Sequence, residues 1–145
     1  MAQRHQSSED SLAAALGMLR ERRQRVTGAR RAVLEVLTGE HGPFTADEIH
    51  RRMAKGRCDL VTVYRCLAAL EELKIVRRCD FGDGAFRYEF DGGEPHHHHI
   101  ICRRCHSVQT IHLCVAESLE RAARDMGYRN VSHSLELFGL CPKCK

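Results

Sequence analysis

The sequence of 145 residues contains no apolar run near the roughly 20 residues that a bilayer-spanning helix requires. Its first ten residues are polar and include two acids, so they lack the apolar centre of a signal peptide. There is also no internal repeat, and no low-complexity tract apart from four consecutive histidines. These absences predict a cytoplasmic protein that does not associate with a membrane.

A strong excess of one charge sign is missing as well. The formal net charge is only +4, so the charge of the whole molecule says little about nucleic-acid binding. Residues 20–31 nevertheless contain six arginines against the single acid Glu21, a composition that suits contact with phosphates but also suits a solvated helix face. These arginines are Arg20, Arg22, Arg23, Arg25, Arg30 and Arg31.

Four of the eight cysteines form two Cys-x-x-Cys pairs. In a reducing compartment this spacing favours metal binding over disulfides, and four thiolates suffice for a closed tetrahedral zinc site. The pairs are far apart in the sequence, so the zinc must hold the C-terminus against a larger domain. We predict a structural zinc site at Cys102, Cys105, Cys141 and Cys144.

The four histidines lead directly into Ile100 and Ile101, which favours an extended segment. Successive side chains of a strand point to opposite faces, so His96 and His98 face one way while His97 and His99 face the other. One strand can therefore supply ligands to two metal sites. An affinity tag or a polar loop would also be histidine-rich, but this run is internal and adjoins an apolar strand.

Helices are predicted for the first part of the chain. The segment 11–21 is the first, and a second follows Thr27. Thr45 and Glu48 form a capping box for the third, and Asp59 caps the fourth. Two strands, 75–81 and 85–90, flank a Gly-Asp-Gly turn. Helices followed by a hairpin predict a winged helix-turn-helix.

A short linker, residues 92–95, separates this part from a different pattern. Strands are expected at 97–101, 108–111 and 131–138, with a helix at 115–126. Such a small unit with exposed sheet edges is naturally completed by a second copy, which predicts a homodimer. The expected fold is α+β, with a DNA-binding domain at 1–91, a hinge at 92–95 and a small α/β dimerisation domain at 96–145.

Several motifs, taken in this order, resemble the ferric uptake regulator family over nearly the whole chain. The resemblance implies a dimeric, metal-sensing transcriptional repressor that binds A·T-rich palindromic DNA and controls genes of zinc or iron uptake and homeostasis. The motifs lie at residues 45–49, 62–67, 87–89, 96–99, 102–105, 133–137 and 141–144.

The resemblance also implies two further metal sites. One consists of His96, His98, Glu117 and His133, all of which are present. The other, a hinge or sensory site, contains His97 and His99.

The match to the family's hinge site is incomplete. Iron and peroxide sensors of the family usually have a histidine where this chain has Pro43 and an acid where it has Thr110.

Glu89 and Asp91 are the candidates to complete the hinge site, because they share one strand face. His41 and Cys79 are close enough in sequence to be considered, although Cys79 is more simply a small core residue, and Arg77 stands where some zinc regulators place a ligand. Loss of an oxygen ligand and gain of a thiolate favour zinc over iron or manganese as the second divalent metal.

For DNA binding, the fourth helix is expected to enter the major groove. Tyr64 is the candidate for base contact, unless it is a core aromatic residue, and Thr62 and Arg65 suit phosphates. Arg25 can reach a minor groove, and Arg30 is placed for a phosphate.

Three other functions are compatible with parts of the sequence. A zinc-dependent hydrolase is an alternative of a different class, but no His-Glu-x-x-His helix is present and the basic winged helix would have no role. A thiol oxidoreductase would need one Cys-x-x-Cys at the start of a helix, rather than two matched pairs. A peroxide-sensing regulator of the same family is the remaining alternative. We therefore predict a regulator and not an enzyme.

Overall fold

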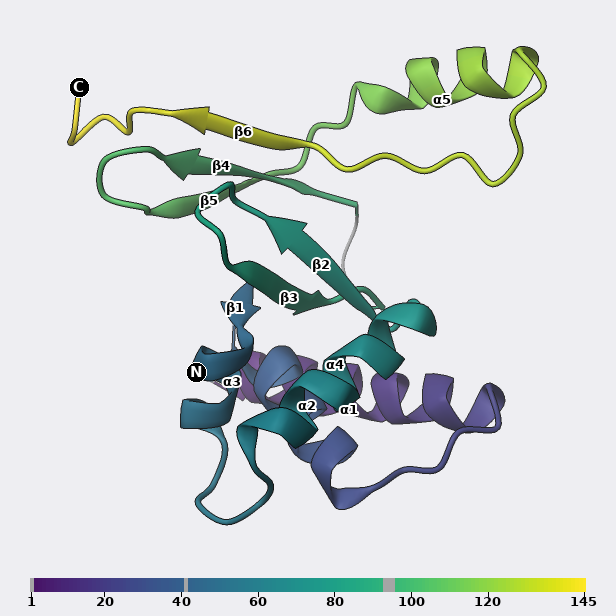
Figure 1. Ribbon diagram of the computed structural model, residues 1–145, viewed down its shortest axis with the longest axis vertical. Helices are drawn as coiled ribbons and strands as arrows, with labels where there is room; N and C mark the ends of the chain where they lie inside the picture. Colours follow the sequence, from purple (N-terminus) through teal and green to yellow (C-terminus); the bar gives the residue numbers. More distant parts are fainter. Residues whose placement is uncertain (1, 41, 93–95) are drawn as a thin grey trace. The chain divides into compact units, whose positions relative to one another are not determined.

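The computed structural model describes residues 2–40, 42–92 and 96–145, with side chains from residue 8 onward. The chain divides into two compact units, Met1–Gly93 and Glu94–Lys145 (Figure 1). His41 and most of the predicted hinge lie outside the described residues. Among the described helices, none combines the length and the apolar character needed to cross a membrane.

The first unit has four helices, and capping side chains fix the starts of the last three. The Thr27 hydroxyl accepts a hydrogen bond from the Arg30 amide at 3.2 Å. Thr45 and Glu48 form both bonds of a capping box, at 3.2 and 2.8 Å. The Asp59 carboxylate accepts from the Thr62 amide at 2.8 Å. The helices are α1 (Ala2–Glu21), α2 (Gly28–Gly39), α3 (Ala46–Arg52) and α4 (Leu60–Glu72).

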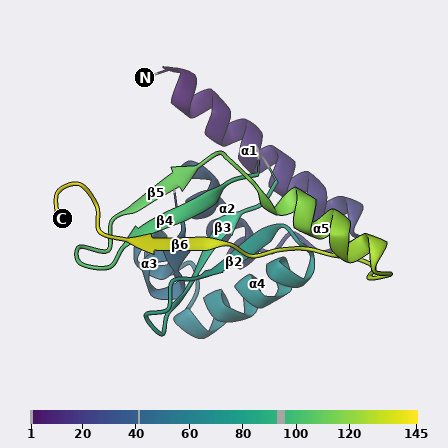
Figure 2. The same ribbon diagram turned by 90° about the horizontal axis from the view of Figure 1, so that it is seen from above.

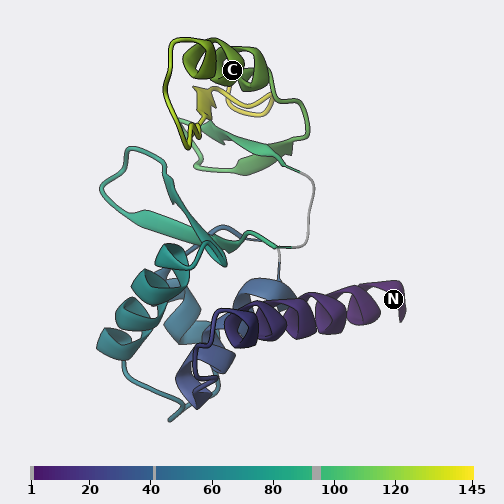
Figure 3. The ribbon, with the colours of Figure 1, turned by 90° about the vertical axis from the view of Figure 1, so that its right-hand side faces the viewer.

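A three-stranded sheet follows these helices in the first unit, and Figure 3 shows its hairpin beside α4. Strands β2 (Val76–Asp80) and β3 (Phe86–Phe90) pair antiparallel, and the two-residue β1 (Phe44–Thr45) adds to the other edge of β3. The turn requires residues with positive φ, which Gly82 and Gly84 supply at 71° and 82°. The order of helices and hairpin is that of a winged helix-turn-helix.

The core of the first unit is formed by the inner faces of α1 to α4 and the sheet. Leu34, Ile49, Leu67 and Leu70 have no exposed surface. Each such side chain contributes about 1.5–3 kcal/mol by leaving water. This packing fixes the outward face of α4, where Tyr64 is 49% exposed.

The second unit is a three-stranded sheet with one helix. Strand β4 (His98–Cys102) lies between β5 (Val108–Ile111) and β6 (Glu136–Gly139), as Figure 2 shows. It pairs antiparallel with β5 and parallel with β6. Helix α5 (Ala116–Asp125) lies beyond the end of this sheet and does not cover its face (Figures 1 and 2).

The predicted α+β fold, with a winged helix before a small α/β unit that carries four clustered cysteines, is confirmed. Three details differ. Helix α1 begins at Ala2 and not near residue 11, because the polar residues before residue 11 show no apolar period that marks a helix in the sequence. Strand β1 was not expected, since two residues give no periodic pattern. Strand β6 is only Glu136–Gly139, because residues 131–135 have no partner strand in the described sheet.

Candidate metal centres

The first centre is the cysteine cluster, which we define as Cys102, Cys105, Cys141 and Cys144. All four sulfur atoms lie within 4.8 Å of one another. The parallel pairing of β4 with β6 sets Cys102 opposite Gly139 and so brings the two Cys-x-x-Cys turns together. The distance between Cys105 Sγ and Cys141 Sγ is 3.7 Å. Tetrahedral zinc with Zn–S bonds of about 2.3 Å requires about 3.8 Å between sulfurs, so the donor set fits this ion.

Hydrogen bonds favour thiolates in part of the cysteine cluster. Backbone N–H groups of Cys105 and Cys141 lower the pKa of Cys102 to about 5, and the Cys141 amide lies 3.3 Å from Cys102 Sγ. The Ser107 hydroxyl similarly lowers the pKa of Cys105. A hydrogen bond with the Cys141 sulfur raises the pKa of Cys144 to about 12. A dication at the centre would favour the thiolate form of all four cysteines.

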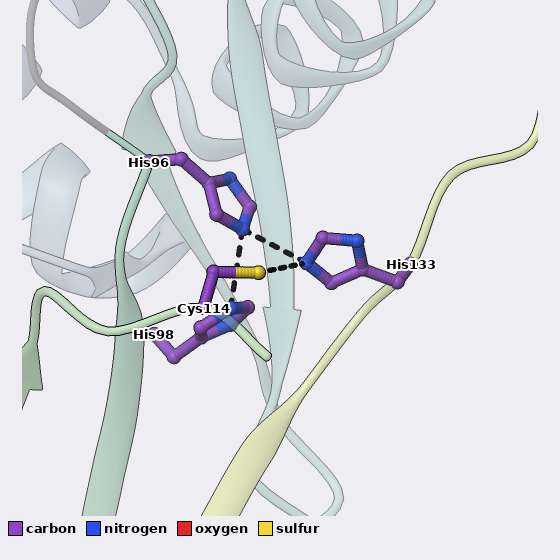
Figure 4. Close-up of side chains that lie close together, drawn as sticks. All are labelled: His96, His98, Cys114 and His133. Atoms are coloured by element: carbon purple, nitrogen blue, oxygen red, sulfur yellow. Dashed lines mark hydrogen bonds between the residues drawn. The ribbon is translucent and has the colours of Figure 1, made fainter. Parts of the chain in front are cut away.

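The second centre is the histidine–cysteine cluster, which we define as His96, His98, Cys114 and His133 (Figure 4). Its ligand atoms also lie within 4.8 Å of one another. The Nε2 atom of His96 lies 3.1 Å from that of His98 and 2.8 Å from that of His133. The Cys114 sulfur lies 3.5 Å from His133 Nε2. Three nitrogens and one sulfur at these separations suit one small tetrahedral ion.

The imidazoles of this cluster are oriented by hydrogen bonds at their other nitrogen. His133 Nδ1 lies 2.7 Å from Glu120 Oε1, and His98 Nδ1 lies 3.2 Å from the carbonyl oxygen of Leu135. Nδ1 must be the donor to these oxygens, so Nε2 of both rings is left as the lone-pair atom that can bind a metal. The hydrogen bond with His133 also lowers the pKa of Glu120, which keeps the carboxylate charged.

The structure does not bring Glu117, the ligand implied by the family resemblance, into this cluster. Helix α5 starts at Ala116, which leaves Glu117 exposed in its first turn. Cys114, in the irregular segment before α5, provides the fourth ligand atom instead. The sequence analysis gave Cys114 no role because it has no Cys-x-x-Cys partner. Glu120, one helical turn after Glu117, was also missed.

The other two histidines of the run are His97, just before β4, and His99, within it. The His97 and His99 ring centroids are 5.3 Å apart, and His99 Nδ1 lies 3.3 Å from Glu136 Oε2 across the β4–β6 pairing. Glu136 is a neighbour that the sequence analysis missed, although period-two alternation in β6 could have indicated it.

The acids predicted for the hinge site, Glu89 and Asp91, belong to the first unit. Glu89 Oε1 accepts a hydrogen bond from Arg77 Nε at 2.8 Å, and the Cys79 sulfur lies 3.9 Å from the same oxygen. This carboxylate is therefore already neutralised by a guanidinium within its own unit. The complete hinge site remains a prediction.

The predicted DNA-binding residues lie on the surface of the first unit. Tyr64 and Arg65 are exposed on α4, and Thr62 is half-buried near its start. Arg25 is exposed before α2, and its carbonyl oxygen accepts a hydrogen bond from Arg30 at 2.9 Å. Tyr64 is therefore not a core aromatic residue, and its hydroxyl lies 3.5 Å from an Asp47 carboxylate oxygen.

Comparison with known proteins identifies the family. The model of the ferric uptake regulator family matches residues 21–138. The peroxide-responsive repressor PerR of Staphylococcus epidermidis is 28% identical over 143 residues, which cover 97% of this chain and 94% of that protein. The structure of a zinc-bound manganese uptake regulator is 34% identical, with a TM-score of 0.65 and coverage of 88% of this chain and 98% of that one.

A third comparison supports the fold alone. The Helicobacter pylori ferric uptake regulator Fur, described as having three functional metal-binding sites, is 21% identical with a TM-score of 0.72. The alignment covers 94% of this chain and 93% of that one. These relatives are regulators, and the family match spans most of the chain. The chain therefore belongs to the ferric uptake regulator family, whose members are dimeric, DNA-binding, metal-responsive regulators.

Proposed function

We propose that this chain represses transcription of genes for metal-ion uptake or homeostasis when the histidine–cysteine cluster is filled. The observation that carries the proposal is the convergence of three Nε2 atoms and one sulfur within 4.8 Å, in a chain of this family. A structural zinc ion in the cysteine cluster would hold the C-terminus on β4. The ion in the histidine–cysteine cluster would be the effector.

Zinc is the effector that the ligands favour. Manganese and magnesium prefer oxygen ligands, whereas imidazole and thiolate together suit zinc in a four-coordinate site. Replacement of the expected Glu117 carboxylate by the Cys114 thiolate moves the site in this direction. The hinge site, with His97, His99, Glu89 and Asp91, is proposed as a second regulatory position that would link the two units.

The second unit is proposed to bind a second copy of the chain. Few of its residues are buried, and many large apolar side chains are exposed. So many exposed apolar side chains in a small unit favour an interface, and strands β5 and β6 are both sheet edges. The exposed side chains include Leu113, Val115, Leu119, Met126, Tyr128, Leu137, Phe138 and Leu140.

The dimer would place two α4 helices in successive major grooves of an A·T-rich palindrome. Tyr64 would contact a thymine methyl group, while Thr62 and Arg65 would hold phosphates. Arg25 would enter a minor groove, and Arg30, which holds the Arg25 carbonyl, would steady that segment.

The proposal can be tested by DNA binding as a function of metal. An operator is first selected from a random duplex library in the presence of zinc. Binding to that operator is then titrated with zinc, ferrous and manganous ions, and zinc should act at the lowest free concentration. Cys58→Ser serves as a control and should respond to the three ions as the unmodified chain does, because Cys58 is half-buried and belongs to no described metal cluster. Equal response to all three ions, or none, would contradict the proposal.

A comparison of the full palindrome with a single half-site tests the role of the dimer. Only chains with the correct separation of recognition helices, about 34 Å per DNA turn, can bind both half-sites. Metal should therefore increase affinity for the palindrome much more than for the half-site. An equal gain on both would mean that metal acts on the recognition helix itself.

A peroxide-responsive repressor is the second candidate function. It is favoured by the similarity to PerR of Staphylococcus epidermidis over nearly the whole chain. A protein whose operator binding does not depend on zinc but is lost after brief exposure to peroxide would support this alternative.

A further inference from the structure

We infer that Cys114 is an oxidant-sensitive ligand, so that peroxide releases the effector ion by oxidising the metal centre's own thiolate. This inference rests on the proposed function, in which the histidine–cysteine cluster holds that ion. It adds a specific chemical event, at one named atom, by which the centre would be emptied.

Cys114 differs chemically from the three other ligands of the histidine–cysteine cluster. A cysteine bound to a metal is a thiolate. Mild oxidants convert thiolates to sulfenic acid under conditions in which imidazoles are not oxidised. The three other members of the cluster are histidines. Cys114 is therefore the oxidisable ligand of this centre.

Cys114 also lies where a small oxidant can reach it from solvent. Cys114 is half-buried and lies in the irregular segment between β5 and α5. A half-buried residue outside the sheet keeps part of its surface in contact with solvent, so a small oxidant can approach Cys114 without opening of the sheet.

Cys114 differs from Cys102 of the cysteine cluster in the hydrogen bonds that its sulfur receives. Exposure does not separate the two centres, because Cys105 is exposed, but the Cys102 sulfur accepts a hydrogen bond from the Cys141 amide at 3.3 Å. Within the described part of the chain, the hydrogen-bond partner of Cys114 Sγ is His133 Nε2, which is itself a ligand atom. Once a metal occupies that nitrogen, the Cys114 sulfur keeps no N–H donor to reduce its nucleophilicity.

The proposed step is balanced with hydrogen peroxide as the oxidant. The Cys114 thiolate attacks one peroxide oxygen, the O–O bond breaks, and hydroxide leaves with the electron pair. Sulfur is oxidised by two electrons to the sulfenic acid and peroxide is reduced, with one solvent proton converting hydroxide to water. The metal loses its anionic ligand and is left with three neutral imidazoles.

The oxidised form should be recovered by a small thiol. No other described cysteine belongs to the same cluster, so an internal disulfide is not the expected product. One small thiol would displace water from the sulfenic acid to give a mixed disulfide. A second would release the Cys114 thiol and leave as its own disulfide.

The test uses the full chain loaded with zinc and treated with increasing hydrogen peroxide. Three quantities are measured together: zinc released to a chromophoric chelator, the site of sulfenic acid trapped by a dimedone-type reagent, and affinity for the selected operator. We expect release of one zinc per protomer, trapping at Cys114, and at least a tenfold loss of operator affinity. A small thiol with added zinc should restore binding.

Two variants make the test specific. Cys114→Asp has no thiol at this position, so peroxide should lower its operator affinity, relative to its own untreated value, by a much smaller factor than it lowers that of the unmodified chain. Cys58→Ser should remain as sensitive as the unmodified chain. The inference is overturned if trapping in the unmodified chain occurs first in the cysteine cluster, or if peroxide lowers the operator affinity of Cys114→Asp by the same factor as that of the unmodified chain.

The failure of the inference can be told apart from failure of the proposed function. If untreated protein does not respond to zinc in operator binding, the proposed function itself is wrong. If it responds to zinc but the loaded protein keeps its metal and stays unmodified at Cys114 in peroxide, only the inference fails. Trapping on the unmodified chain decides the question even if Cys114→Asp does not bind zinc.

Discussion

Removal of the Glu120 carboxylate should weaken metal binding without touching any ligand. Glu120 Oε1 lies 2.7 Å from His133 Nδ1, so the carboxylate fixes the ring orientation and leaves Nε2 toward Cys114 and His96. Loss of such a partner typically lowers metal affinity by about 10- to 100-fold. We therefore expect Glu120→Ala to weaken zinc binding to the histidine–cysteine cluster by a factor in this range. Glu120→Gln keeps an acceptor oxygen and should fall between Glu120→Ala and the unmodified chain.

Glu117→Ala is the matched control on the same helix. Glu117 is exposed and lies outside the cluster, so its removal should leave zinc affinity unchanged. Competition with a chromophoric chelator would distinguish the zinc of the cysteine cluster from the weaker zinc of the histidine–cysteine cluster, and of these two only the weaker should respond to Glu120→Ala. The reasoning is refuted if Glu117→Ala releases zinc as His133→Ala does while Glu120→Ala has no effect. That result would restore Glu117 as the fourth ligand.

Three further changes test other parts of the molecule. Cys102→Ser should remove the structural zinc and unfold the second unit, because binding free energy on the order of 10 kcal/mol for such a site is also folding free energy; zinc content and circular dichroism measure both. Thr45→Ala breaks the capping box with Glu48 and should lower the free energy of unfolding by about 1 kcal/mol in urea titrations. Hydrogen bonds from Arg87 lower the pKa of Asp83 to about 2, so this pair stabilises the wing above pH 4 and the contribution disappears as pH falls from about 4 to 2. Asp83→Asn should therefore make the free energy of unfolding less dependent on pH between about 4 and 2. If the pH dependence is unchanged, Asp83 does not contribute to it.

Much of the fold could be predicted because several signals are local. A capping box or a Gly-Asp-Gly turn is decided by neighbouring residues, and Thr45, Asp59 and Gly82 occupy the expected places. Elements that depend on distant partners were less accessible. Strand β1 exists because Phe44 pairs with Tyr88, and no pattern within two residues reveals that pairing.

The candidate site shows the same division between local and distant information. The strand alternation that relates His96 to His98 follows from their spacing, and the structure places both rings in one cluster with His133. The choice between Cys114 and Glu117 depends on where α5 begins. Cys114 lies before α5 and Glu117 lies in its first turn. A shift of the helix start by a few residues would therefore change which of the two side chains approaches His133. Sequence patterns locate helix ends only to within two to four residues or so, which is too coarse for this choice.

The composition of the histidine–cysteine cluster has a consequence for how this chain could sense metal. Its ligands come from three segments, at the start of β4, before α5 and before β6, and only the first is adjacent to a strand that is held on both sides. An ion that joins them therefore orders the irregular segments around α5, and part of its binding free energy is spent on that ordering. The apolar side chains proposed to form the dimer interface, including Leu113, Val115 and Leu119, lie in or beside the same segments. Metal binding and dimer formation would then each favour the other by the same factor, because coupling between two binding events is reciprocal.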